Sequence, residues 1–185
     1  MSFRMGRNVK RRVKDAHQQV TPDQALSLEV LEILQSFYFL KCERPESDDP
    51  VENMRTLKFI GLLHQDIVLR LCKFVEEDSR SWSFAQAFKK LRKRSAHTFV
   101  DAEVQRRIEE FRNVVRPSRE HRDSYIAHHS KRDRAHLKPP EFLPAIRLAV
   151  EITDMLAGEE VSYRLLGIDL RERSSTLESE EKVSE

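Results

Sequence analysis

The stretch that decides the fold is Thr21–Cys42, TPDQALSLEVLEILQSFYFLKC. It opens with a helix start signal, because Thr21 can cap a first turn that tolerates Pro22 and places Asp23 at the positive end of the helix dipole. Apolar residues then recur at helical spacing: Leu26, Val30, Ile33, Leu34 and Phe37. This spacing predicts one amphipathic helix that ends near Cys42, before the loop ERPESDDP.

Similar start signals and apolar spacing occur farther along the chain. Asp49 and Pro50 start a second apolar-striped helix that we expect to continue to about Glu77. Ser83 can cap a short helix, and a further helix is expected from about Phe99.

Proline and glycine divide the second half. Pro117 interrupts or kinks its helix, after which Ser118 can cap a restart. The last long helix is expected to begin near Phe142 and to stop at Gly158, with a short terminal helix in EEVSYRLLGIDL, residues 159–170. Strand-like alternation is absent, so we predict an all-α bundle of four to five main helices.

Length and composition indicate one domain. The 185 residues suffice for a substantial core, and only 4 are glycine. We expect a disordered basic arm at 1–20, a helical domain at 21–168 and a disordered acidic tail at 169–185. No apolar run approaches the roughly 20 residues of a membrane span, and the N-terminus lacks the apolar region of a secretory signal. We therefore expect a cytoplasmic protein without membrane contact, in which Cys42 and Cys72 are reduced and buried.

The net charge of +2 excludes a strong polyanion binder over the whole chain, but the charge is clustered. Six basic residues lie in the first fifteen, and Lys89, Lys90, Arg92, Lys93 and Arg94 form a second cluster. A third cluster contains Arg112, Arg116, Arg119, Arg122, Lys131, Arg132 and Arg134. Such clusters can hold phosphates, or they can be solvated helix faces.

The stretch HRDSYIAHH, His121–His129, carries the candidate chemistry. A guanidinium can bind a phosphate through two donors, a histidine can move a proton near neutral pH, and Asp123 can hold either group in position. These groups suffice for metal-free RNA cleavage, with a second histidine supplied by His121, by His129 or by a second copy. The chain contains no CxxC, HExxH, GxSxG or glycine-rich phosphate loop, so we expect no cofactor.

Helix geometry leaves the reacting histidine open. On a straight helix, Arg122 and His129 lie about 20° apart and Arg122 and His128 about 120° apart, yet a long arginine can reach both. Because His128 and His129 themselves point roughly 100° apart, they are poorly placed to share an ion, and we expect no metal site.

The segment RDSYIAH, Arg122–His128, resembles the signature of the HEPN superfamily, an arginine and a polar residue followed by a histidine after a gap of four to six residues. The form HRD…IAH, together with HQDIVLRLCKFVEEDSRSWSFAQAFKKL at 64–91, is similar to the abortive-infection U-like branch. The resemblance covers most of residues 22–158.

The resemblance implies a dimeric helical bundle that acts as a metal-independent endoribonuclease, in phage defence or in a toxin–antitoxin system with an antitoxin partner. It assigns catalysis to Arg122 and His128, with Asp123 as the polar helper, while His121 and His129 remain possible support. RNA-binding residues are expected in the third basic cluster: Arg112, Arg116, Arg119, Lys131 and Arg132.

A non-catalytic helical module that binds a nucleotide or dimerises is the alternative. In that case Arg122 forms an ion pair with Asp123 or Glu120, and His128 is stabilised by the dipole at a helix C-terminus.

Overall fold

The computed structural model describes residues 20–76, 82–93, 100–127 and 141–173, without the side chains of 125–127. The described helices, in chain order, are α2 (Pro22–Cys42), α3 (Pro50–Lys73), α4 (Phe84–Leu91), α5 (Asp101–Val114), α6 (Arg116–His121), the π-helical turn η1 (Arg122–Ala127) and α7 (Leu143–Ala157). Over these residues the only strands are β1 (Arg164–Leu165) and β2 (Ile168–Asp169), an antiparallel pair. The prediction of an all-α fold is confirmed.

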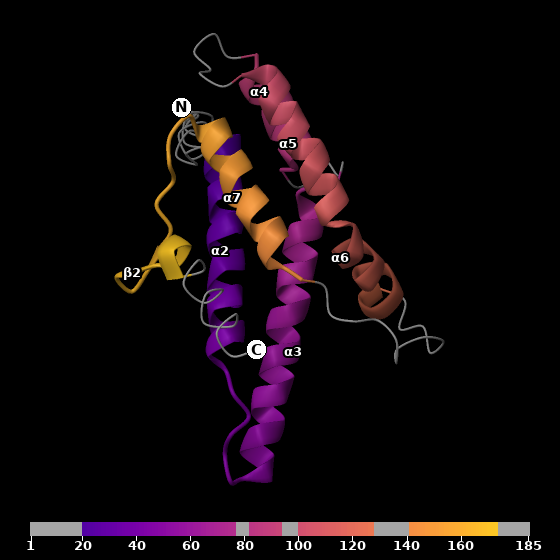
Figure 1. The fold of residues 1–185 in the computed structure, drawn as a ribbon, viewed down its shortest axis with the longest axis vertical. Helices are drawn as coiled ribbons and strands as arrows, with labels where there is room; N and C mark the ends of the chain where they lie inside the picture. The colour runs from indigo at the N-terminus through magenta and orange to yellow at the C-terminus, as the bar shows by residue number, and fades with distance from the viewer. Residues whose placement is uncertain (1–19, 77–81, 94–99, 128–140, 174–185) are drawn as a thin grey trace, which may run out of the picture.

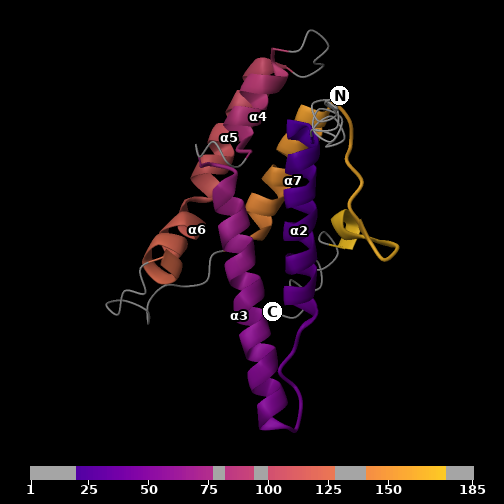
Figure 2. The same ribbon diagram turned by 180° about the vertical axis from the view of Figure 1, so that it is seen from behind.

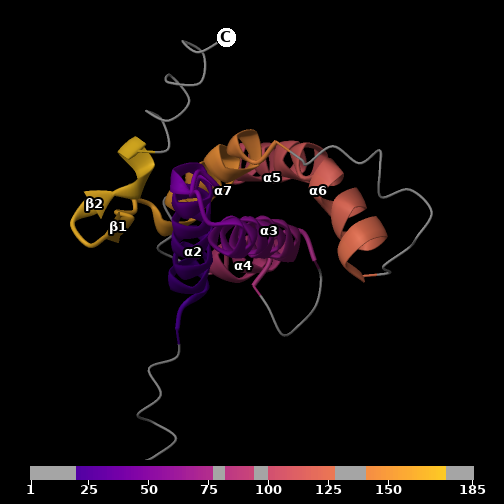
Figure 3. The ribbon, with the colours of Figure 1, turned by 90° about the horizontal axis from the view of Figure 1, so that it is seen from below.

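Helices α2 and α3 form a long antiparallel hairpin, and α7 lies against α2 (Figure 1). Helix α5 packs on α7 and continues into α6, so that α7, α5 and α6 follow one another in an arc beside α2, α3 and α4 (Figure 3). The first half of α3 extends beyond α6 and α7, with only the end of α2 and the connecting loop beside it (Figures 1 and 2). None of the described helices has the length and apolar character that a membrane span requires.

Local capping explains where the helices begin and end. Asp49 Oδ1 accepts a hydrogen bond from Val51 N at 2.8 Å, and Ser83 Oγ accepts one from Gln86 N at 3.4 Å, so both predicted start signals are confirmed. Gly158 has a φ of 76° and ends α7, because a residue with a Cβ rarely adopts this left-handed conformation.

The core lies between α2, α3, α4, α5 and α7, each of which contributes buried apolar residues to one cluster. Three buried aromatic rings join the end of α3 to α4 and α5. The Phe74 ring stacks on Phe84 at 4.4 Å between centroids, and Phe84 meets the edge of Phe111 at 5.1 Å. This aromatic cluster fixes the segment after α3, which carries one of the residues of the candidate site.

Two local predictions are wrong. Ser118 lies buried inside α6 and caps nothing; Val115 precedes that helix, and Pro117 occupies its first turn, where a missing N–H costs no hydrogen bond. The terminal helix predicted over 159–170 is replaced by the β1–β2 hairpin, because Leu166 and Gly167, with φ of 50° and 86°, form a left-handed turn.

The ends of the domain also differ from expectation. Cys42, predicted to be buried, is the exposed last residue of α2, whereas Cys72 is buried as predicted. Leu170 is buried and Arg171 Nη2 contacts Asp154 Oδ2 at 2.8 Å, so these two residues pack on the helices although they lie beyond residue 168, the expected end of the domain. Residues 1–19 of the predicted arm and 174–185 of the predicted tail lie outside the described residues.

Candidate functional site

Arg122 begins the π-helical turn η1, which directly continues α6. Turns of π-helix are rare, have wider i→i+5 hydrogen bonding and occur frequently at functional sites. The straight-helix geometry of about 100° per residue therefore does not apply to this segment, and it cannot be used to favour His129 over His128 as the partner of Arg122.

The Arg122 side chain is 19% exposed and is held by two carboxylates. Its Nε donates a hydrogen bond to Asp123 Oδ1 at 2.8 Å, and its Nη1 forms an ion pair with Glu76 Oε1. The predicted contact with Asp123 is therefore present, while the second partner is Glu76 and not Glu120. Within the described part of the chain, the Nη2 group makes no hydrogen bond, so both of its N–H donors remain for another acceptor.

Glu76 reaches Arg122 because the chain turns immediately after α3. Its backbone N–H donates to Lys73 O at 3.3 Å, and Phe84 N donates to Phe74 O at 3.0 Å, which anchors the start of α4 beside this turn. The pairing thus connects α3 to η1 across 46 residues of sequence.

Charge and burial define the electrostatics around Arg122. Partial burial disfavours its charged form, but the hydrogen bond to Asp123 and the surrounding negative groups outweigh this effect and raise the pKa of Arg122 above its ordinary value. Burial also raises the pKa of the neighbouring Cys72 thiol to about 11, since charging it would require desolvation. Arg122 is therefore a permanent cation, and Cys72 is a protonated thiol at neutral pH rather than a nucleophile.

Two histidines lie near each other where α3 meets α6. Burial lowers the pKa of His121, and burial together with the charge of His121 lowers the pKa of His64. The His64 ring also contacts Phe142, with ring centroids 4.6 Å apart. Burial therefore favours the neutral form of both imidazoles, and a neutral imidazole can accept a proton.

The predicted RNA-binding arginines differ in whether a carboxylate pairs with them. Arg112 Nη1 pairs with Glu109 Oε2 at 3.0 Å, whereas Arg116 Nη2 donates to the neutral amide of Asn113 at 3.0 Å. Arg119 is exposed and lies near enough to Cys72 to affect the pKa of its thiol. Over the described residues, Arg116 and Arg119 form no ion pair, so these two are the better placed to meet a phosphate.

The remaining predicted residues, His128, His129, Lys131 and Arg132, lie outside the described residues. The structure therefore brings together Arg122, Asp123 and Glu76, with His121 next in sequence. It gives no contacts for the two candidate reacting histidines.

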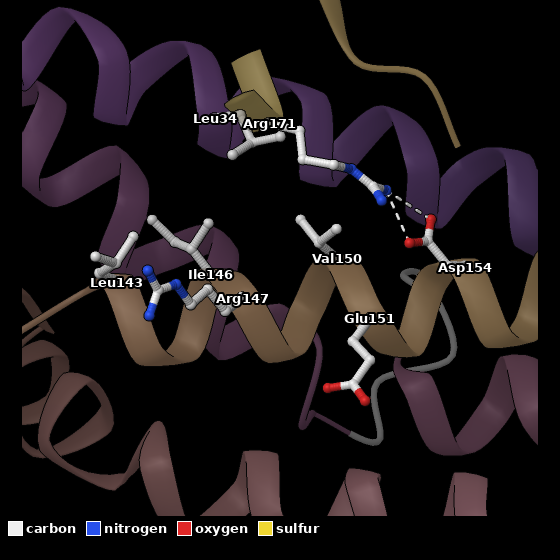
Figure 4. Close-up of a pocket in the computed structure, with 8 residues that line it drawn as sticks. All are labelled: Leu34, Leu143, Ile146, Arg147, Val150, Glu151, Asp154 and Arg171. Carbon is white, nitrogen blue, oxygen red and sulfur yellow. Dashed lines mark hydrogen bonds and ion pairs between the residues drawn. The ribbon is translucent and has the colours of Figure 1, made fainter. Parts of the chain in front are cut away.

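No group of three or more potential metal ligands occurs among the described residues. A separate groove of about 270 Å³ lies between α2 and α7, and Figure 4 shows its lining residues. The apolar side chains of Leu34, Ile146 and Val150 lie along it, and the Arg171–Asp154 ion pair closes one side. None of the predicted site residues lines this groove.

Glu76 is the site residue that the sequence alone does not identify. The available signal is its position, since an acid directly after a helix C-terminus meets the negative end of the dipole and therefore needs a cation nearby. The pattern does not say which of the many arginines supplies that cation.

The arrangement presents a fixed guanidinium with free donors, beside a neutral histidine and a π-helical turn. Such a group can bind an anion and stabilise negative charge that develops on it. No known protein family, curated protein or solved structure matches this chain.

Proposed function

We propose that this chain is a metal-independent endoribonuclease of the HEPN type, with Arg122 and His128 as the catalytic pair. The observation that carries the proposal is the Arg122 guanidinium, held by Asp123 and Glu76 at the start of a π-helical turn. Two carboxylates fix its plane, while Nη2 keeps its donors for a phosphate oxygen.

In this mechanism a neutral histidine removes the proton from the ribose 2′-OH. The 2′-oxygen forms a bond to phosphorus, and the bond from phosphorus to the 5′-oxygen breaks. A protonated histidine donates its proton to the departing 5′-oxygen, so the products carry a 2′,3′-cyclic phosphate and a 5′-hydroxyl. Arg122 stabilises the extra negative charge on the phosphorane. His128 is one of the two histidines, and the other comes from His121, from His129 or from a second copy.

A homodimer is part of the proposal, and an exposed apolar stripe on α3 supports it. Val51, Met54, Leu62 and Leu69 are 59%, 60%, 62% and 41% exposed. They lie within about 80° of one another around the helix axis, so they form one face. Exposed apolar residues that gather on one face of a helix are typical of a protein–protein interface, and on α3 the exposed Lys58 lies among them.

Arg116 and Arg119 would hold the RNA backbone on the approach to Arg122, together with Arg112, Lys131 and Arg132 of the same basic cluster. By the resemblance, the biological setting is phage defence or a toxin–antitoxin system in the cytoplasm, with an antitoxin protein as a further partner.

A non-catalytic helical module that dimerises or binds a nucleotide is the second candidate. One observation favours it, since the carboxylates of Glu76 and Asp123 neutralise the charge of Arg122. A structural ion pair that holds the end of α3 to η1 would have the same contacts. In that case the guanidinium stabilises the fold and meets no substrate.

The test is cleavage of a mixed RNA pool in the presence of EDTA by the parent protein and by Arg122→Ala and His128→Ala. Arg106→Ala is the matched control, because Arg106 is an exposed arginine that pairs with Glu103 within α5, outside the site. The melting temperature of each variant is measured in parallel.

The nuclease proposal expects cleavage by the parent and by Arg106→Ala, with a large loss in the two site variants that still fold. If the chain is a non-catalytic module, we expect no cleavage by any of the four proteins and a lower melting temperature for Arg122→Ala. Cleavage at parental rate by both folded site variants would contradict the catalytic assignment.

A further inference from the structure

The exposed side of α4 carries a dense positive charge that the proposed active site does not use. Lys89, Lys90, Arg92 and Lys93 are all exposed at the C-terminal end of this helix. At about 100° per residue they span roughly 160° of its circumference. The buried residues Phe84, Ala87, Phe88 and Leu91 occupy the opposite side.

Little negative charge compensates this basic face. Helix α4, FAQAFKKL, contains no acidic residue. Arg92 Nε lies 3.8 Å from Asp101 Oδ2, a long contact between two exposed side chains. Among the described residues no carboxylate pairs with Lys89, Lys90 or Lys93. The arginines of α5 differ, because Arg106 and Arg107 are each bound to neighbouring glutamates.

An aromatic surface adjoins the lysines. The Lys90 ammonium lies over the Trp82 ring, 4.6 Å from its centroid, and Trp82 is half-buried just before α4. Arg92 lies over the Phe88 ring at 5.8 Å. Cations that track a phosphate backbone, beside an aromatic ring on which a base can stack, are the usual elements of single-strand binding.

We propose that this α4 face, formed by Trp82, Lys89, Lys90, Arg92 and Lys93, is a binding site for single-stranded RNA. The lysines contact successive phosphates, and a base stacks on the exposed part of the Trp82 ring. An acidic peptide would satisfy the lysines but would leave the aromatic ring unused, so the combination favours a polynucleotide. The choice of RNA as the polynucleotide rests on the proposed function.

The two ends of the α4 face lie at different places along α5. Arg92 is next to Asp101, the first residue of α5. Trp82 lies two residues before Phe84, whose ring contacts Phe74 after α3 and Phe111 near the end of α5. Glu76, the partner of Arg122, also follows α3, so the Trp82 end of the face is the end nearer to Arg122.

Trp82 is the only tryptophan of the chain, so its fluorescence reports on this site alone. The experiment titrates the His128→Ala protein, which leaves the RNA intact, with a 12-nucleotide oligouridylate at several salt concentrations. The same titration is made with the additional changes Lys89→Gln and Lys93→Gln. An additional Arg164→Gln serves as the control, because it removes an exposed basic residue of β1 instead. Circular dichroism checks that each variant is folded.

The expected result is saturable quenching of Trp82, unchanged in the Arg164→Gln control. The double lysine variant should bind more weakly, and the slope of log affinity against log salt should fall by about 1.4, or about 0.7 for each lost phosphate contact. Trp82 fluorescence that stays constant while a labelled oligouridylate binds would overturn the proposal. Equal quenching by a synthetic peptide of sequence SSTLESEEKVSE would also overturn it, in favour of an acidic peptide ligand.

The outcome is separable from that of the nuclease test. Because binding is measured without cleavage, an inactive parent protein leaves a positive result at Trp82 intact. Conversely, cleavage with no response at Trp82 would overturn the α4 site alone.

Discussion

At the scale of the residue, the Arg122 side chain is held by ion pairs with Glu76 and Asp123. Asp123 is its neighbour in the chain, so their contact lies within η1 itself. Glu76 follows a different helix, and its ion pair forms only when η1 packs beside the end of α3. The contact with Glu76 therefore reports on the tertiary arrangement of the site.

A double-mutant cycle with Glu76→Gln and Arg122→Gln tests this contact. We expect a coupling energy of about 0.5–1 kcal/mol in urea unfolding, since the pair is partly exposed and water screens it. The pair Glu109–Arg112, more exposed and within one helix, is the control and should give about 0.3–0.5 kcal/mol. A coupling energy within error of zero for Glu76 and Arg122 would mean that the ion pair does not hold η1 to α3.

The two partly buried histidines predict how stability depends on pH. The pKa values of His64 and His121 are lowered in the folded protein, so the unfolded chain binds their protons more readily. Their contribution to stability is complete above the unfolded pKa of about 6.5 and is lost as the pH falls through the lower folded values. Melting temperatures measured from pH 7.5 to 5.5 should therefore fall on acidification.

Replacing His64 with glutamine removes one of the two groups, so the fall in melting temperature between pH 7 and pH 5.5 should become shallower in His64→Gln. The control variant is Gln105→Asn, which changes an exposed neutral side chain of α5 and leaves both histidines, so it should keep the parental slope. An identical pH dependence in the parent and in His64→Gln would show that this histidine does not sense the folded environment.

The sequence could predict part of this site. Asp123 was one of two local partners that the sequence offered for Arg122, with Glu120 as the other, and adjacency alone does not choose between them, because neighbouring residues on a helix point about 100° apart. Glu76 lies 46 residues from Arg122, and a single sequence contains no signal for which acid meets which arginine at that separation. The buried state of Cys72 follows from its place in the apolar stripe of α3. Cys42 also follows an apolar stripe, but it is the last residue of α2 and is exposed.

At the scale of the element, the helices with polar caps were predictable. The Asp49, Ser83 and Gly158 signals act through one or two local hydrogen bonds or one φ angle, so they are visible in sequence. Helix α6 was misjudged because its start lacks a side-chain cap and depends on Pro117 in its first turn. The π-helical turn η1 has no local sequence rule, because hydrogen bonding from i to i+5 depends on the packing around it.

The apolar stripe on α3 gives a prediction for this element. We expect the parent protein to sediment as a dimer at micromolar concentration and Leu62→Glu to sediment as a monomer, because a buried charge in the middle of the stripe is costly to desolvate. Leu28→Glu on α2, which replaces a 54% exposed leucine outside the stripe, should remain dimeric. A monomeric parent, or a dimeric Leu62→Glu, would refute this interface.

At the scale of the whole molecule, the fold separates three surfaces. The apolar stripe Val51, Met54, Leu62 and Leu69 runs along α3, whose first half extends away from the bundle (Figures 1 and 2). The Arg122 cluster lies where α3 meets α6 and η1, and the Arg92 end of the basic α4 face lies beside the start of α5. The proposed activity needs the first surface to join two copies and the second to cleave the RNA, while the third holds the strand. Composition predicted the all-α class but could not predict this separation, which depends on how the helices pack.

The most direct test of the central claim is the chemistry of the RNA ends produced in EDTA by the parent protein, compared with Arg122→Ala and His128→Ala. The account predicts fragments with a 2′,3′-cyclic phosphate and a 5′-hydroxyl, produced by the parent and lost in both folded variants, because the 2′-oxygen is the nucleophile and Arg122 stabilises the phosphorane. Fragments with a 5′-phosphate and a 3′-hydroxyl, or cyclic phosphate ends produced undiminished by the variants, would contradict it.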